Sequence, residues 1–171
     1  MSKYSNTAAV GQINDMACWA ACLKWWYKAE MSINASQTAL WDLYKHLELP
    51  QGGMSDTGIQ HIISQNAMKS LPFIKATDFT AARVVELLNS GAIYTAYSRT
   101  GHQMKHVNVI YKIVDADSDW ASVWVMEPQF SSKGDGTWRG KREKRSLSDY
   151  NMQGSVFAGV RRTSATIPDG S

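Results

Sequence analysis

The chain has no long apolar run and no visible targeting segment. None of its apolar stretches approaches the roughly 20 residues that a membrane-spanning helix needs. Residues 1–10 are polar and lack the basic start and apolar centre of a secretory signal peptide. We therefore expect a protein without a signal peptide and without a membrane partner.

Cysteine is scarce, with two residues in a chain of 171. Cys18 and Cys22 lie four positions apart, which puts them on one face of a helix in a geometry poor for a disulfide. Two cysteines also make no disulfide framework. We expect a reducing compartment, which would also suit a catalytic thiolate.

Several binding motifs are missing as well. The chain has no phosphate-binding Walker loop, no glycine fingerprint for dinucleotides and no Gly-x-Ser-x-Gly elbow. Its two cysteines and distant histidines lack the paired short spacings of structural zinc sites. The sequence therefore predicts no cofactor and no metal site.

The composition that is present indicates one folded domain. Apolar residues make up 44% of the chain, and seven of them are tryptophans, which favours a globular core. The net charge of +3 is mild, but basic residues concentrate over 133–145 and at 161–162. We interpret the first run as a solvated loop or strand end, with an acidic or nucleic-acid partner as the alternative. Our prediction is that the protein binds no nucleic acid.

Residue periodicity places helices first and strands afterwards. Apolar residues at helical spacing predict helices over 18–31, 36–47, 56–66 and 80–90. Runs of β-branched and aromatic residues predict strands over 71–74, 92–97, 106–114, 121–127, 138–144 and 155–161. This order predicts an α+β fold with an antiparallel sheet. We expect a single domain over 1–171, extended at its start and flexible over 1–8 and 163–171.

One short segment combines a thiol with an amide donor. Gln12 lies six positions before Cys18, where the first predicted helix begins. The N–H groups and positive dipole end of a helix N-terminus favour a thiolate. Gln12, in the loop just ahead, can donate its side-chain amide to an oxyanion. The segment predicts a nucleophile and half of an oxyanion hole.

A cysteine nucleophile also needs a base and a group that orients the base. His106 opens a strong strand, whereas the other histidines lie in predicted helices or a turn: His46, His61 and His102. Glu127 ends the next strand, and we expect Pro128 to terminate that strand and fix where Glu127 points. Weaker candidates for the orienting group are Asn14, Asp15, Asn108, Asp115 and Asp117.

Gln12, Cys18-Trp19, His106 and the acid–proline pair, in this order, resemble the papain-like cysteine peptidases. Within that superfamily the sequence is most similar to the avirulence-protein cysteine proteases of bacteria, from about Ala9 to Arg162. The resemblance implies N-terminal helices packed on a C-terminal antiparallel sheet, with the active site in the cleft between them.

The resemblance also implies roles for individual residues. Cys18 would be the nucleophile, His106 the base, Glu127 the orienting acid and Gln12 the oxyanion donor. Such proteases usually have Asp-Pro where this chain has Glu127-Pro128, so Asn108 or a water molecule is the alternative third member. We further expect Trp19 and Asn108 in the substrate cleft.

These residues predict a cysteine protease that works through a thioester, with Cys18 as a thiolate beside the His106 imidazolium. The resemblance implies a bacterial effector or toxin domain that a specialised secretion system delivers into the cytoplasm of a target cell. Its partners would be a protein or peptide substrate and a cognate immunity or inhibitor protein. The alternatives are a deamidase or transglutaminase, a peptidoglycan amidase, and a catalytically inactive binding module on the same scaffold.

Overall fold

The computed structural model describes residues 3–99 and 104–162. His102 and the chain end over 163–171, for which we expected a turn and a flexible tail, lie outside the described residues. Within the described part of the chain, no helix has the length and apolarity to cross a membrane.

The helices form where the apolar periodicity predicts them, and side-chain caps start three of them. Their bounds are α1 Cys18–Met31, α2 Gln37–Tyr44, α3 Asp56–Gln65, α4 Ala81–Leu88 and the short α5 Ser148–Asn151. The side chains of Ser36, Ser55 and Thr80 accept backbone N–H groups in the first turns of α2, α3 and α4. Helix α2 is shorter than predicted because the chain tightens into a 3₁₀ turn over Lys45–Leu47.

The strands form one six-stranded sheet. Their bounds are β1 Met68–Phe73, β2 Ile93–Ser98, β3 Lys105–Val114, β4 Ser122–Ser132, β5 Trp138–Ser146 and β6 Val156–Arg161. The strand order is β1-β6-β2-β3-β4-β5, and every neighbouring pair is antiparallel. This architecture confirms the predicted α+β class.

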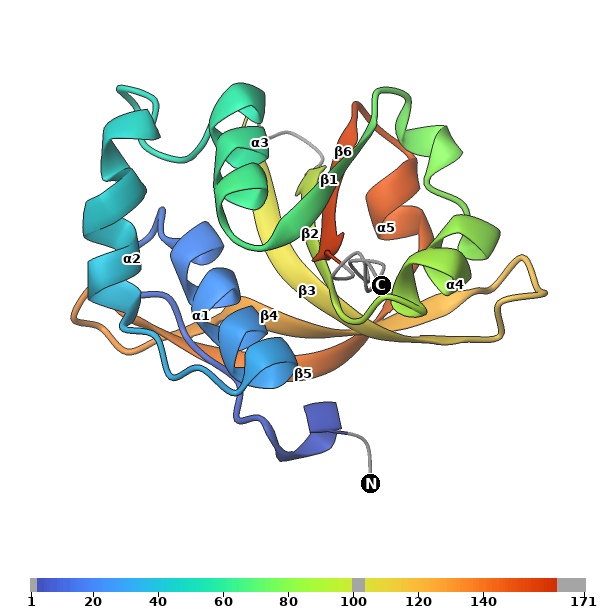
Figure 1. The fold of residues 1–171 in the computed structure, drawn as a ribbon, viewed down its shortest axis with the longest axis horizontal. Helices are drawn as coiled ribbons and strands as arrows, with labels where there is room; N and C mark the ends of the chain where they lie inside the picture. Colours follow the sequence, from blue (N-terminus) through green and yellow to red (C-terminus); the bar gives the residue numbers. More distant parts are fainter. Residues whose placement is uncertain (1–2, 100–103, 163–171) are drawn as a thin grey trace, which may run out of the picture.

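Helices cover both faces of the sheet. One core joins α1 and α3 to side chains such as Val107 and Val109 of β3. A second core, on the opposite side of the same strands, contains Ile110 together with residues of α4 and α5. Figure 1 shows α1 and α2 on one side of the strands and α4 with α5 on the other. The N-terminal helices therefore pack on the sheet as predicted, and the two later helices close its second face.

Strand β4 does not end at Pro128, so that prediction was wrong. The pairing of β4 with β5 shifts register between Glu127 and Ser131, and Pro128 lies within this irregularity. A proline is tolerated there because the ladder does not require its missing N–H. The Pro128 carbonyl instead accepts a hydrogen bond of 3.2 Å from the backbone N–H of Gln12.

The start of the described chain packs against the body of the fold, which differs from the expected extended arm. Lys3–Asn6 form a 3₁₀ turn. The ring of Tyr4 stacks on Trp25 at a centroid distance of 6.2 Å, and its hydroxyl donates to the buried carboxylate of Glu30 at 2.7 Å. Glu30, near the end of α1, thereby links the first residues to the helix.

Candidate active site

Two of the predicted site residues share one cavity. A cavity of about 210 Å³ lies at the start of α1, and both Cys18 and His106 line it. The remaining lining residues are Asp15, Met16, Gly53, Arg99, Met104, Lys105 and Gln129. The fold thus brings a thiol from the first helix and an imidazole from β3 to the same small space.

Cys18 is the first residue of α1, as predicted, but its thiol is buried. Burial is the largest influence on its pKa and raises it to about 11, although a hydrogen bond with the backbone of Val107 lowers it. This shift favours a neutral thiol over the resting thiolate that we expected. A neutral thiol of this kind must lose its proton to a neighbouring base before it can attack.

The imidazole of His106 is bonded to a carboxylate on the neighbouring strand. Its Nε2 lies 2.7 Å from Oε1 of Glu127, and the backbone N–H of Gln129 donates to the same oxygen at 2.9 Å. Both side chains are almost fully buried. Because Nε2 is occupied by Glu127, Nδ1 is the ring nitrogen left to exchange a proton with a group in the cavity.

Three of the other candidates for the orienting group have different partners. Asn108 donates to the hydroxyl of Tyr150 at 2.7 Å, and Asp15 accepts from the indole of Trp138 at 2.7 Å. Asn14 accepts from the backbone of the adjoining turn. Glu127 is therefore the predicted candidate that the structure brings to His106, despite being one methylene longer than an aspartate.

Burial and charge shift the titration of this pair. Burial is the largest influence on His106 and lowers its pKa; the Glu127 carboxylate opposes this, and Arg99 and Arg145 reinforce it. For Glu127, burial alone would raise the pKa, but the hydrogen bond and charge of His106, together with Arg145, bring it below its usual value. The pair is thus poised as a neutral imidazole beside an ionised carboxylate.

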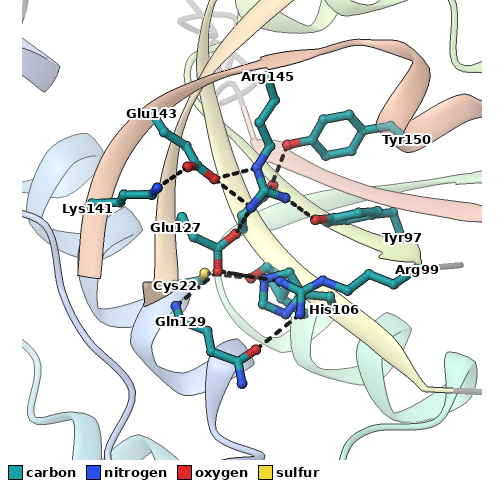
Figure 2. A network of polar contacts seen from close by, with 12 residues as sticks. Cys22, Tyr97, Arg99, His106, Glu127, Gln129, Lys141, Glu143, Arg145 and Tyr150 are labelled. Carbon is teal, nitrogen blue, oxygen red and sulfur yellow. Dashed lines mark hydrogen bonds and ion pairs between the residues drawn. The ribbon is translucent and has the colours of Figure 1, made fainter. Parts of the chain in front are cut away.

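Arg145, which pairs with Glu127, was not among the site residues predicted from the sequence. Arg145 Nη2 lies 2.8 Å from Glu127 Oε2, and the same guanidinium contacts Glu143 and the hydroxyl of Tyr97, each at 2.5 Å (Figure 2). Arg99 approaches Glu127 Oε1 at 3.8 Å. The carboxylate therefore lies between the imidazole and two guanidinium groups.

Arg145 belongs to a sequence pattern that could have indicated its role, although we interpreted the run over 133–145 as solvated. Lys141, Glu143 and Arg145 alternate along β5, which places their side chains on one face of the strand. The register aligns Lys141 with Glu127, so this face of β5 adjoins the carboxylate. Charges of alternating sign at strand spacing were the available signal for a half-buried network of ion pairs.

Gln12 is held by its backbone and has an unsatisfied side chain. Its N–H donates to Pro128 of β4, and its carbonyl accepts from the N–H of Trp138 of β5 at 2.9 Å. The side chain is buried, and neither its nitrogen nor its oxygen has a hydrogen-bond partner among the described residues. A buried amide without a partner costs about 1–3 kcal/mol, so it calls for an explanation, and a catalytic role is one such explanation. Gln12 is not among the residues that line the cavity.

Trp19 and Asn108, which we expected in the substrate cleft, are not among the residues that line the cavity of Cys18 and His106. Both side chains are fully buried. The indole of Trp19 packs edge-on against Tyr44 and donates to Glu48 at 3.3 Å. Trp19 follows Cys18 by one position along α1, and its side chain points into the core. Asn108 is hydrogen-bonded to Tyr150, which lies on the opposite side of the sheet from α1.

A cavity that joins a cysteine at a helix start to a histidine–carboxylate pair, within this fold, defines a cysteine peptidase of the papain-like type. The family model described as "papain-like cysteine protease AvrRpt2" matches residues 4–153, and the chain belongs to this family. No curated protein matches the sequence.

Solved structures share the fold at low sequence identity. The peptidase domain of Streptococcus ComA, a bifunctional ABC transporter involved in quorum sensing, is 15% identical with a TM-score of 0.59. The match covers 92% of this chain and 100% of that domain. A double glycine motif protease from an AMS/PCAT transporter, in complex with the leader peptide, is 9% identical with a TM-score of 0.55, over 90% of this chain and 91% of that one.

Proposed function

We propose that this cysteine peptidase cleaves peptide bonds through a thioester on Cys18, with His106 as base and acid, Glu127 as orienting group and Gln12 as oxyanion donor. The observation that carries the proposal is the 2.7 Å bond between His106 Nε2 and Glu127 Oε1. It leaves Nδ1 as the ring nitrogen not bonded to Glu127, and both His106 and Cys18 line one cavity.

The first half of the reaction makes the acyl-enzyme. Nδ1 of His106 takes the thiol proton as Sγ of Cys18 attacks the carbonyl carbon of the scissile bond. The carbonyl oxygen gains negative charge and accepts hydrogen bonds from Gln12 Nε2 and the Cys18 N–H. The C–N bond then breaks, and Nδ1 returns its proton to the leaving amine. This order fits a neutral thiol because no resting ion pair is needed.

Water completes the cycle. His106 Nδ1 removes a proton from the attacking water, whose oxygen bonds to the thioester carbon. The C–S bond breaks, and the proton on Nδ1 returns to the Cys18 sulfur as the carboxylic product leaves. Glu127 keeps Nε2 protonated throughout, which presents the Nδ1 lone pair to the thiol and stabilises the imidazolium in between.

The substrate in this proposal is a protein or peptide. A structural neighbour with the same fold is solved in complex with a leader peptide, which supports a peptide in the corresponding place. A bacterial effector or toxin role is part of the same proposal, and it follows from the resemblance to the avirulence-protein proteases. Delivery into the cytoplasm of a target cell by a specialised secretion system, and a cognate immunity or inhibitor protein, belong to the same proposal.

Product analysis on a proteome-derived peptide library tests the reaction. The wild-type protein should create new peptide termini that mass spectrometry detects, the Cys18→Ala variant should create none, and Cys22→Ala should retain cleavage. Equal cleavage by Cys18→Ala would overturn the proposal.

A deamidation mass shift or cross-linked peptides without cleavage would replace proteolysis with deamidase or transglutaminase chemistry, and release of amines from peptidoglycan alone would indicate an amidase. An unreactive Cys18 would indicate a binding module.

A further inference from the structure

Gln37, the first residue of α2, makes two contacts with the loop that carries Gln12. Its side chain is buried. The amide nitrogen donates to the carbonyl of Gly11, and the amide oxygen accepts from the N–H of Ile13. Both hydrogen bonds measure 3.1 Å. A single side chain thus binds the backbone on both sides of Gln12.

Three residues from three different elements form hydrogen bonds with the backbone around Gln12. Gln37 of α2 holds the carbonyl before it and the N–H after it. Pro128 of β4 accepts from its own N–H, and Trp138 of β5 donates to its own carbonyl. Of these contacts, the two from Gln37 come from a side chain, so substitution can remove them without altering the main chain of the sheet.

The segment around Gln12 packs closely against β5. A Cβ added to Gly11 would lie 1.8 Å from the carbonyl oxygen of Trp138, and one added to Gly140 would lie 2.3 Å from the carbonyl oxygen of Val10. The backbone therefore approaches β5 as closely as glycine permits. Gln37 holds the opposite side of the same segment, so the main chain of Gln12 is fixed between α2 and the sheet.

We propose that Gln37 is a positioning residue for the oxyanion donor, an inference that rests on the proposed function. An oxyanion hole stabilises developing charge because its donors are already in place and need no reorganisation. The side-chain amide of Gln12 has no hydrogen-bond partner among the described residues, so no hydrogen bond of its own fixes its direction, and the position of its main chain matters more. Gln37 fixes that main chain and thereby aims Nε2 of Gln12.

A purely structural role is the competing explanation, since Gln37 also joins α2 to the loop. The two roles differ in which reactions of Cys18 they affect. Acetyl transfer from p-nitrophenyl acetate forms the Sγ–C bond through an oxyanion and expels nitrophenolate. Alkylation by iodoacetamide forms the Sγ–CH₂ bond with loss of iodide and develops no oxyanion. A positioning residue for the oxyanion donor should affect the first reaction alone.

The experiment measures both rates for wild type, Gln12→Ala, Gln37→Met and the double variant. Gln12→Ala should slow acetylation by about 10²-fold, the effect typical of removing one oxyanion donor. Gln37→Met should slow it by a large part of that factor, and neither should change the iodoacetamide rate. In the Gln12→Ala background, Gln37→Met should cost nothing further because its effect acts through Gln12. Gln65→Met, at an exposed glutamine of α3, serves as the matched control and should behave as wild type.

Different results would contradict the positioning role of Gln37 and the oxyanion role of Gln12. If Gln37→Met slows both reactions equally, or if its effect multiplies with that of Gln12→Ala, Gln37 has only a structural role and the inference falls. If Gln12→Ala leaves acetylation unchanged, the proposed oxyanion role of Gln12 falls instead. Thermal unfolding checks that Gln37→Met is folded. If it is not, Gln37→Glu, which keeps the acceptor for Ile13 and loses the donor for Gly11, should show the same selective loss of acetylation.

Discussion

Glu127 shares its buried carboxylate between His106 and Arg145. Oε1 lies 2.7 Å from the imidazole Nε2, and Oε2 lies 2.8 Å from the guanidinium Nη2 (Figure 2). The arginine keeps the carboxylate ionised, yet its positive charge also acts on the imidazole. Glu127 and Arg145 therefore shift the pKa of His106 in opposite directions: the carboxylate raises it and the guanidinium lowers it.

Replacing Arg145 by methionine should shift the pH dependence of the reaction upward. The guanidinium lowers the pKa of His106, so its removal raises that pKa and protonates the base at higher pH. The acid limb of the rate of acetylation by p-nitrophenyl acetate should move to higher pH. Arg145→Lys, which keeps the charge, should shift the limb less. An unchanged limb, or one moved to lower pH, would show that the arginine does not act on the imidazole.

Replacing Glu127 by glutamine should shift the acid limb of the acetylation rate in the opposite direction, to lower pH. The carboxylate raises the pKa of His106 through its hydrogen bond and its charge, so its loss lowers that pKa and moves the acid limb to lower pH. The rate on the plateau should fall by about 10²- to 10⁴-fold because the imidazole loses its fixed tautomer. A limb that moves upward in Glu127→Gln would contradict the assignment of Glu127 as the partner of His106.

Aspartate should not substitute for Glu127 in this chain. A side chain shorter by one methylene cannot span from β4 to both His106 and Arg145 at the present distances without movement of the strand. A misplacement of about 1 Å at an active site costs on the order of 10²-fold in rate, and we expect a loss of that order for Glu127→Asp. Glu143→Asp, which disturbs Arg145 but does not touch His106, is the control and should cost much less. Wild-type rates in Glu127→Asp would contradict the shared-carboxylate account.

Substitutions at the close contact between the Gln12 loop and β5 should damage both stability and acylation. Gly11→Ala places a Cβ within 1.8 Å of the Trp138 carbonyl oxygen, so the segment must move. Overpacking of this kind costs about 1–3 kcal/mol, which denaturant unfolding can measure. Gly134→Ala is the control: no atom lies within 4 Å of its added Cβ, and its positive φ of 84° costs about 1 kcal/mol. Acetylation should slow in Gly11→Ala and stay normal in Gly134→Ala.

Local patterns in the sequence were sufficient to predict much of the fold. The helix beginning at Cys18 follows from its apolar spacing, and the strand beginning near His106 follows from a run of β-branched residues. Both are properties of neighbouring residues. Pro128 misled the prediction because its effect depends on a register shift between two strands, which no local pattern shows.

The electrostatics of the site depended on contacts between distant segments. Whether Arg145 is solvated or buried is decided by the pairing of β5 with β4, and the pKa of the Cys18 thiol is decided by how much protein covers it. The role proposed for Gln37 depends on the packing of α2 against a loop some 25 positions earlier in the chain. Spacing along the sequence carries none of this information.

The acylation of Cys18 with His106 as its base is tested most directly with p-nitrophenyl acetate. Mass spectrometry locates the acetyl group in wild type and in His106→Ala, and the rate of acetylation is measured in both. We expect a transient acetyl group on Cys18 that water removes, and a much lower rate of its formation in His106→Ala. Cys22 should stay unmodified, since it is fully buried and burial raises its pKa well above the usual value. Acetylation of Cys22 in place of Cys18, or an equal rate without His106, would contradict the account.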